Sequence, residues 1–368
     1  MRVAVVGAGI FGASVAYHLV REGADVVLID RADEGRATAA GAGIVCPWAS
    51  RVDDPASYAL LAGGARFYPG LVANLAEEGE TELGYARVGG LMAPDDPAEL
   101  DAAEARVRAR VGNTGEAGAI ERLTPQQARE LFPPLREDLA GLFVSGGARV
   151  NGRLIAAAMR RAAAKRGAQI VEGSAELILR DGWAAGVRVD GDAIDADAVV
   201  VAAGAWAPAL LEPVGVRLAV EPQRGQIVHL RLPGTDTSRW PTLQPLNPYY
   251  LLAFDDSRVV IGASREFGSG FEHRLTASGV AGVLNAGLHT APGLASWTLH
   301  EIRIGFRPLS ADNRPMLGPA PGVDGLWIAN GLGASGLTMG PYAGALLAAA
   351  VLGKTPELSL VPYDPGRL

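Results

Sequence analysis

The chain has 368 residues, of which 49% are hydrophobic and 20% charged, the balance of a folded globular protein. Its net charge is −7, from 33 basic and 40 acidic residues, and it has no basic run, which argues against nucleic acid or an anionic membrane as a partner. Its one cysteine, Cys46, excludes an internal disulfide and suits a reducing, cytoplasmic compartment.

The length predicts two domains, since single cores rarely grow to this size. A strand pattern that begins at residue 2 predicts no removable signal. The longest run of small apolar residues, 344–353, is too short to cross a bilayer, so no transmembrane segment is expected.

The first thirty residues predict a dinucleotide site. Strand, glycine turn, helix and strand follow one another over residues 2–6, 7–12, 13–22 and 24–29. In this G-x-G-x-x-G turn, Gly7 permits the bend, Gly9 lets a pyrophosphate approach the backbone, and Gly12 allows the helix to pack on the strand. Asp30 is placed to bind a ribose hydroxyl, which argues against a 2′-phosphate and leaves FAD or NAD.

The segment 31–43 is rich in Ala, Gly and Thr. Such small residues allow a ligand to lie against the backbone, so we expect this loop to run along a flat cofactor. A loop that only packs under a helix is the alternative. Helices are expected over 58–77, 94–111, 124–131 and 151–166, and the charged ones among them read as surface cover.

The remaining segments predict a buried parallel strand, an antiparallel region and a second glycine turn. The expected strands are 85–92, a run from 141, 169–172, 177–179, 186–189, 198–203, 226–232, 249–254, 258–262, 299–306 and 325–329. On 299–306, side-chain alternation places Ile302, Ile304 and Phe306 on one face and Arg307 on the other, and Pro308 is expected to end the strand. A glycine-rich turn at 330–336 opens a helix over 337–352, so both ends of the chain are expected to meet one ligand.

The order of these motifs resembles the D-amino-acid oxidase (DAO) family of FAD-dependent oxidoreductases, particularly its glycine-oxidase and D-amino-acid-dehydrogenase members. The matching segments cover nearly the whole chain and are residues 5–19, 37–48, 199–207, 249–266, 305–318 and 330–341. The resemblance implies an α/β FAD-binding Rossmann-like domain of glutathione-reductase type and an α+β substrate domain with an antiparallel sheet. It implies an FAD-binding domain of residues 1–84, 141–220 and 308–368, and a substrate domain of 85–140 and 221–307.

The resemblance also implies FAD rather than NAD, and oxidative deamination of small D- or N-methyl amino acids. A hydride passes from the substrate α-carbon to flavin N5, and the resulting imino acid hydrolyses; oxygen or a quinone then accepts the electrons. Some relatives attach FAD through a cysteine near the position of Leu309 and Ser310, where this chain has none, so non-covalent FAD is expected. A homo-oligomer is compatible with the sequence.

Two residues are expected to hold the substrate. Arg307 is predicted to bind its carboxylate, because a planar guanidinium can do so with two hydrogen bonds; a structural ion pair with Asp312 is the alternative. The resemblance implies a position near the substrate for Tyr250; a place in the core or on the surface is the alternative. Weaker pocket candidates are Arg265, which could instead pair with Glu266, and Trp48 and Cys46, which could instead be core residues.

The predicted cofactor contacts come from the two glycine turns, the small-residue loop and the segment after 198–203. They are Gly7, Gly9, Ile10, Phe11, Gly12, Asp30, Arg31, Thr38, Ala39, Ala42, Gly43, Ile44, Ala203, Gly204, Trp206, Arg307, Gly331, Gly333, Ala334, Ser335, Gly336, Leu337 and Thr338. Amides at the start of the last helix are expected to face the flavin N1 and C2 carbonyl, where reduction places negative charge.

Three rival functions stay open at this point: an FAD-dependent 2-hydroxy-acid dehydrogenase, an FAD-binding subunit of a larger complex and an NAD-dependent dehydrogenase. The first needs a base for the hydroxyl proton, commonly histidine, and the five histidines are scattered. The same scatter predicts no metal site.

Overall fold

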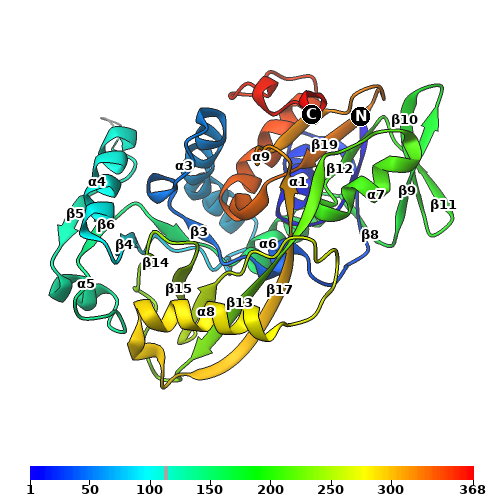
Figure 1. Ribbon diagram of the computed structural model, residues 1–368. Helices are drawn as coiled ribbons and strands as arrows, with labels where there is room; N and C mark the ends of the chain where they lie inside the picture. Colours follow the sequence, from blue (N-terminus) through cyan, green and yellow to red (C-terminus); the bar gives the residue numbers. More distant parts are fainter. Residues whose placement is uncertain (112–114) are drawn as a thin grey trace.

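The computed structural model describes residues 1–111 and 115–368. Within them, a mainly parallel six-stranded sheet lies at one end of the molecule and a mixed eight-stranded sheet at the other (Figure 1). The two sheets agree with the fold class expected from the sequence, a Rossmann-like α/β part and a second part built on a large, largely antiparallel sheet.

The parallel sheet has the order β18-β19-β12-β1-β2-β8. Its strands are β1 (Arg2–Val6), β2 (Asp25–Asp30), β8 (Gln169–Glu172), β12 (Ala198–Val201), β18 (Met316–Pro319) and β19 (Leu326–Asn330). The central strands are nearly continuous apolar runs because helices or a second sheet cover both faces. The antiparallel edge strand β18 was not predicted.

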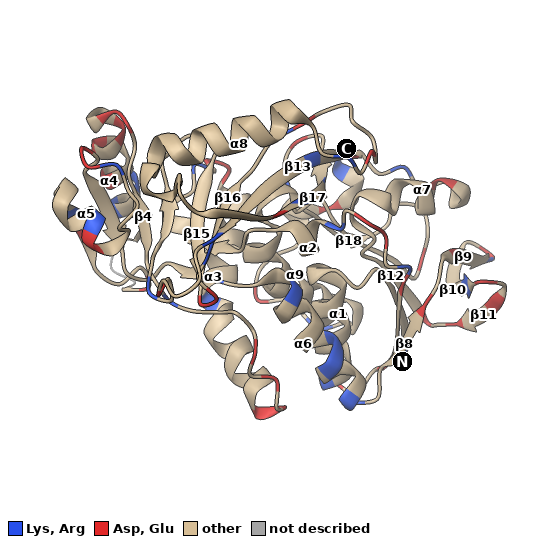
Figure 2. Cartoon of the chain, turned by 90° about the horizontal axis from the view of Figure 1, so that it is seen from below, with Lys and Arg blue, Asp and Glu red and all other residues tan. Residues whose placement is uncertain are grey.

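Four helices share the core on one face of this sheet. They are α1 (Ile10–Arg21), α3 (Pro55–Glu77), α6 (Gly152–Lys165) and α9 (Gly336–Val351). The other face packs against α7 (Ala207–Leu211) and a three-stranded sheet of β9 (Ala175–Arg180), β10 (Trp183–Val189) and β11 (Asp192–Asp195). Basic residues at the C-terminal end of α6, a region visible in Figure 2, pair with acids after α3: Arg161 and Lys165 with Glu80, and Arg166, which follows the helix, with Glu78.

Helix α9 is more apolar than the sequence expectation allowed. The segment Gly333–Val351 has 19 residues and a mean hydropathy of 1.3, which by length and composition would suffice to cross a membrane. However, 67% of this apolar stretch is buried inside the protein, where α9 packs between α1 and α3. Packing within the core therefore explains its composition.

The large sheet has the order β17-β13-β16-β15-β14-β4-β6-β5. Its strands are β4 (Gly90–Met92), β5 (Ile120–Leu123), β6 (Gly141–Val144), β13 (Val220–Arg231), β14 (Thr242–Gln244), β15 (Tyr250–Phe254), β16 (Arg258–Gly262) and β17 (Thr298–Ser310). Helices α4 (Pro97–Val111), α5 (Pro125–Leu131) and α8 (Ala277–Thr290) pack on it, and a separate pair, β3 (Ile44–Val45) and β7 (Ala148–Arg149), joins the two parts.

The expectation that Pro308 ends its strand is wrong. Strand β17 continues to Ser310, and Pro308 lies opposite Pro222 of β13. Because β17 is an edge strand, a proline whose nitrogen cannot donate a hydrogen bond is tolerated there. In the register of this pair, Arg307 lies opposite Gln223.

The sheet topology also bears on the predicted domain boundaries. Strand β6, which a boundary at 141 assigns to the FAD-binding domain, pairs with β4 and β5 in the large sheet, and β17 runs past 307. We therefore propose that β6 and the whole of β17 belong to the substrate domain, which contains the large sheet. A strand belongs with the sheet whose hydrogen bonds it completes.

Asp54 ties the start of α3 to a distant turn. Its carboxylate accepts hydrogen bonds from the Ser57 amide at 2.8 Å and from Arg314 at 2.6 Å. The Arg314 hydrogen bond is the main cause that lowers the pKa of Asp54 to about 2. The stabilisation is therefore present above the unfolded pKa near 3.8 and is lost as pH falls toward 2.

Replacing Asp54 with asparagine is expected to lower the free energy of unfolding by about 1–2 kcal/mol at pH 7, after allowance for solvent screening of this partly exposed pair. Asparagine still caps a helix, so the change isolates the charge. Urea unfolding at pH 7 and pH 3 measures it. An equal loss at both pH values would contradict the role of the charge.

Candidate active site

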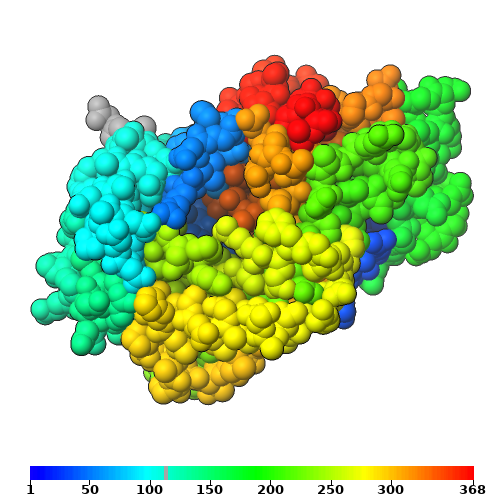
Figure 3. Space-filling view, viewed as in Figure 1, coloured from blue at the N-terminus to red at the C-terminus, as the bar shows by residue number. Residues whose placement is uncertain are grey.

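A cavity of about 950 Å³ runs between the parallel sheet and the large sheet. Its walls come from both glycine turns, the small-residue loop, the segment after β12, and strands β13, β15 and β17. Figure 3 shows the surface hollowed where N-terminal, middle and C-terminal segments meet. Chain segments far apart in sequence thus form one site.

The first glycine turn has the geometry that its motif predicts. Gly7 has φ +106°, and a Cβ there would lie 2.4 Å from the Ala202 carbonyl oxygen. A Cβ on Gly12 would lie 1.8 Å from the Gly7 carbonyl oxygen, so Gly12 serves helix packing and does not line the cavity. Gly9 faces the cavity at the N-terminus of α1, where backbone N–H groups and the helix dipole favour an anion.

Asp30 is fixed at the end of β2. One carboxylate oxygen accepts the Ala8 amide hydrogen at 2.6 Å, and the other accepts the Ala32 amide hydrogen at 2.7 Å and one from Arg36 at 3.2 Å. The carboxylate therefore connects the glycine turn to Arg36, and both Asp30 and Arg36 line the cavity.

A second helix N-terminus faces the same cavity. Helix α9 begins at Gly336, and Leu337 and Thr338 in its first turn line the wall. The Thr338 hydroxyl donates a hydrogen bond to the Ile44 carbonyl at 2.8 Å, which joins this turn to the small-residue loop. Amides of a first helical turn lack partners within the helix, so they suit a ligand oxygen.

Arg307 reaches the cavity from β17. Its Nη1 donates hydrogen bonds to Gln223 Oε1 at 3.2 Å and to the Ser264 carbonyl at 3.1 Å. The alternative ion pair with Asp312 does not form, because Asp312 pairs with Arg367 at 2.8 Å. Burial is the main cause that lowers the pKa of Arg307, and the guanidinium stays charged because its ordinary value is so high.

Tyr250 lies next to Arg307, and both line the cavity. Its ring covers Gly262, where a Cβ would be 2.4 Å from the Tyr250 hydroxyl oxygen. Burial raises the pKa of Tyr250, against the opposing effect of Arg307 and Arg265. The phenol is therefore protonated at neutral pH and can donate a hydrogen bond.

The weaker pocket candidates divide. Arg265 is exposed and lines the cavity, and Glu266 does not pair with it but with Arg224. Cys46 also lines the cavity, and burial raises the pKa of its thiol to about 11, so the thiol is neutral. Trp48 is packed in a core cluster with Met92 and does not line the wall, which favours its alternative role.

The structure brings most of the predicted cofactor residues to one wall. Of that set, those off the wall are Gly12, Ala39 and Gly331, and each has a structural role instead. Gly331 holds a turn at φ +72°, and the Ala39 carbonyl accepts a hydrogen bond from Arg153. The residues on the wall are Gly7, Gly9, Ile10, Phe11, Asp30, Arg31, Thr38, Ala42, Gly43, Ile44, Ala203, Gly204, Trp206, Arg307, Gly333, Ala334, Ser335, Gly336, Leu337 and Thr338.

Sequence reasoning missed two parts of the wall. The residues involved are Gly173, Ser174, Ala175, Glu176 and Leu177 after β8, and Ala209, Leu210, Pro213 and Val214 around α7. The first part adjoins Asp30, whose carbonyl accepts a hydrogen bond from the Gly173 amide at 3.2 Å. The only sequence signal for these residues was a strand followed by a glycine. Gln244, Gly225 and Ile227, near Tyr250, were also missed.

Neither histidine nor a metal cluster contributes to the cavity in the part of the chain that the structure describes. Burial lowers the pKa of His18 to about 4 and that of His229 to about 3, so both are neutral core residues. This arrangement offers no imidazole base to a bound ligand.

Comparisons with known proteins agree with this geometry. The model of the DAO family, described as FAD-dependent oxidoreductase, matches residues 2–350. The uncharacterized oxidoreductase YurR of Bacillus subtilis is 46% identical over 98% of this chain and 97% of its own, and the glycine oxidase of Pseudomonas aeruginosa is 31% identical over 100% and 99%. The crystal structure of iminodiacetate oxidase (IdaA) from Chelativorans sp. BNC1 is 54% identical, covers 99% of both chains and has a TM-score of 0.97. The chain therefore belongs to the DAO family of FAD-dependent oxidoreductases.

Proposed function

We propose that this protein oxidises the C–N bond of a small amino acid or N-substituted glycine, giving an imino acid that water hydrolyses. The observation that carries the proposal is Arg307, a guanidinium without a carboxylate partner among the described residues, next to the Tyr250 hydroxyl in the cavity. The names of the glycine oxidase and iminodiacetate oxidase relatives support an amine that also carries a carboxylate.

The residues on the wall fit an FAD. The turn at Gly9 would hold the pyrophosphate, Asp30 a ribose hydroxyl and the start of α9 the flavin ring. Cys46, the sole cysteine, has a buried neutral thiol, which supports non-covalent binding. When bound, FAD supplies the acceptor for two electrons.

The chain's own residues would then bind and orient the substrate. Arg307 holds the carboxylate with charge-assisted hydrogen bonds, and Tyr250 donates a further one. Fixing the carboxylate fixes the neighbouring carbon, whose C–H bond must face the acceptor. The amine must be neutral, since its lone pair forms the C=N bond as the carbon loses a hydride; water then adds and the amine leaves.

The electron acceptor and the cellular setting are also proposals. The oxidase names of two relatives favour oxygen over a quinone. The single, buried cysteine supports a reducing cytoplasmic compartment.

Replacing Tyr250 with phenylalanine is expected to lower kcat/KM for the amine about tenfold, because one hydrogen bond to a charged group is lost while the ring still covers Gly262. Burial keeps the phenol protonated, so the pH profile between 6 and 9 should keep its shape. Steady-state kinetics across that range measure both. A lost ionisation in the variant would contradict a simple donor role.

Product analysis tests the function. Glycine should give glyoxylate and ammonia, sarcosine glyoxylate and methylamine, and D-alanine pyruvate and ammonia, each in equal amounts. Glycolate and lactate, which carry a hydroxyl in place of the amine, are matched controls. Turnover of the hydroxy acids alone would establish the 2-hydroxy-acid dehydrogenase, and turnover of neither class would favour a subunit that lacks its partner.

A further inference from the structure

Two arginines face the same cavity. Arg307 comes from β17 and Arg265 from the segment after β16, and both line the wall around Tyr250. Their charges lie close enough that Arg265 adds to the lowering of the pKa of Arg307, of which burial is the main cause. Within residues 1–111 and 115–368, neither guanidinium forms an ion pair with Asp or Glu. Two like charges therefore lie near each other on the cavity wall, and neither has an ion-pair partner among the described residues.

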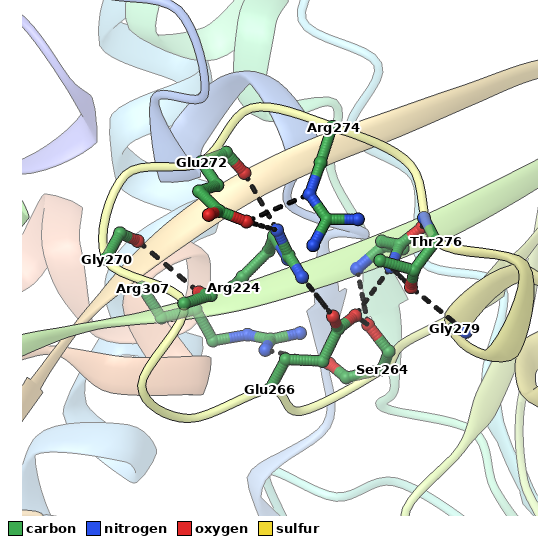
Figure 4. Close-up of polar contacts among 11 residues, drawn as sticks. Arg224, Ser264, Glu266, Gly270, Glu272, Arg274, Thr276, Gly279 and Arg307 are labelled. Atoms are coloured by element: carbon green, nitrogen blue, oxygen red, sulfur yellow. Dashed lines mark hydrogen bonds and ion pairs between the residues drawn. The ribbon is translucent and has the colours of Figure 1, made fainter.

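A neighbouring arginine, in contrast, has acidic partners. Arg224 of β13 is buried and pairs with Glu266 at 2.7 Å and with Glu272 at 3.7 Å, and it also donates to the Glu272 carbonyl at 2.9 Å (Figure 4). A buried charge needs such partners, because desolvation disfavours it otherwise. Arg307 is buried without such a partner among the described residues, and Arg265 faces the same cavity from its exposed edge, so a ligand in the cavity can supply negative charge to both.

The network around Arg224 also fixes where Arg265 points. Glu266 accepts hydrogen bonds from Gln226 and Ser264, both at 2.6 Å, as well as from Arg224. Backbone hydrogen bonds of 3.0 and 2.9 Å pair Glu266 with Arg224. In such extended pairing successive side chains alternate, so Glu266 turns into the network and Arg265 turns to the other side, where the cavity lies.

We infer that the substrate is an amine with two carboxylates, of which Arg307 binds the one on the reacting carbon and Arg265 binds the other. This inference rests on the proposed function and adds its substrate class. A dianion neutralises both guanidinium groups at once, whereas a monocarboxylate leaves the repulsion between them partly in place. Because Arg265 is exposed, solvent screens its charge, and its effect is smaller than that of Arg307.

Iminodiacetate and sarcosine form a matched pair of probes, since both are N-substituted glycines and differ by one carboxylate. The holoenzyme should have a kcat/KM at least about tenfold higher for iminodiacetate. Arg265→Gln should remove most of that ratio by raising KM for iminodiacetate much more than KM for sarcosine, and Arg265→Lys should restore part of it. Arg274→Gln is the control, because Arg274 is exposed on the same segment, pairs with Glu272 at 2.9 Å and does not line the cavity.

A binding measurement separates this inference from the proposed function. Glutarate has the shape of iminodiacetate and butyrate that of sarcosine, but neither carries an amine that could be oxidised. Calorimetry on the holoenzyme should show glutarate binding about tenfold or more tighter than butyrate, and Arg265→Gln should bring the two together. Equal binding of both by the native protein would overturn the inference even if amines are oxidised. Selective glutarate binding without amine oxidation would overturn the proposed function alone.

Discussion

Arg307→Ala is expected to lower kcat/KM for the amine substrate about 100-fold. The side chain offers charge-assisted hydrogen bonds to a carboxylate from within the cavity, and their loss corresponds to about 3 kcal/mol. Most of the loss should appear in KM, because the carboxylate is bound in the ground state as well as in the transition state. Steady-state kinetics of the FAD-loaded variant measure it.

Arg307→Lys serves as the matched variant, since it keeps the charge and loses the planar pair of donors. It should recover part of the loss. The flavin spectrum should be unchanged in both variants if Arg307 acts on the substrate alone. An unaltered KM in Arg307→Ala would show that the carboxylate is held elsewhere.

Gly9→Val is expected to abolish FAD retention while the fold survives. The backbone at Gly9 has φ −68° and ψ −174°, which any residue can adopt, so glycine is not needed there for conformation. Glycine is needed there because a larger side chain has no room. A Cβ would lie 3.2 Å from Thr38 Oγ1 on the cavity wall, and further methyl groups would occupy the site of the pyrophosphate. We expect the affinity for FAD to fall about 100-fold or more, measured by titration of apoprotein.

The control for this change is Gly70→Ala. Gly70 lies exposed in α3, where a Cβ would have no neighbour from another part of the protein within 4 Å, so alanine should raise stability slightly, by about 0.5–1 kcal/mol, and leave FAD bound. If Gly9→Val bound FAD as tightly as the native protein, the pyrophosphate would lie elsewhere.

Features set by neighbouring residues could be predicted from the sequence. The glycine turn, the helix after it and Asp30 follow from local spacing, and the structure has all three, although the helix begins at Ile10, inside the motif, and not at residue 13. Alternation along 299–306 predicts Arg307 on a different face from Phe306; in the structure both residues line the cavity, so the lining does not distinguish the two faces. Such patterns depend on backbone periodicity, which the sequence carries directly.

Features set by distant partners could not be predicted. From the sequence, Pro308 predicts the end of a strand. The strand continues because β17 lies at the edge of its sheet and pairs with β13 on one side only, which the sequence does not show. The wall at 173–177 depends on how the separate sheet of β9, β10 and β11 packs against the parallel sheet. The edge strand β18 is different, because its partner β19 is the next strand in the chain, and the sequence pattern of 316–319 alone did not reveal it. Trp48, in a loop rich in cavity residues, turns into the core instead, because apolar surface next to it needs cover.

The unpaired state of Arg307 and Arg265 was likewise invisible in the sequence. Asp312 and Glu266 stand close enough in the chain to suggest ion pairs, but the fold gives them to Arg367 and Arg224. Only the tertiary arrangement shows which guanidinium groups face the cavity without an acid.

The visible spectrum of the FAD-loaded protein under anaerobic conditions tests the central claim most directly. Iminodiacetate, sarcosine, glycine and D-alanine are added in turn, followed by glycolate and lactate. The account predicts that an amine bleaches the flavin band with one equivalent of substrate, that the hydroxy acids leave it unchanged, and that air restores it. Bleaching by a hydroxy acid and by no amine would contradict it.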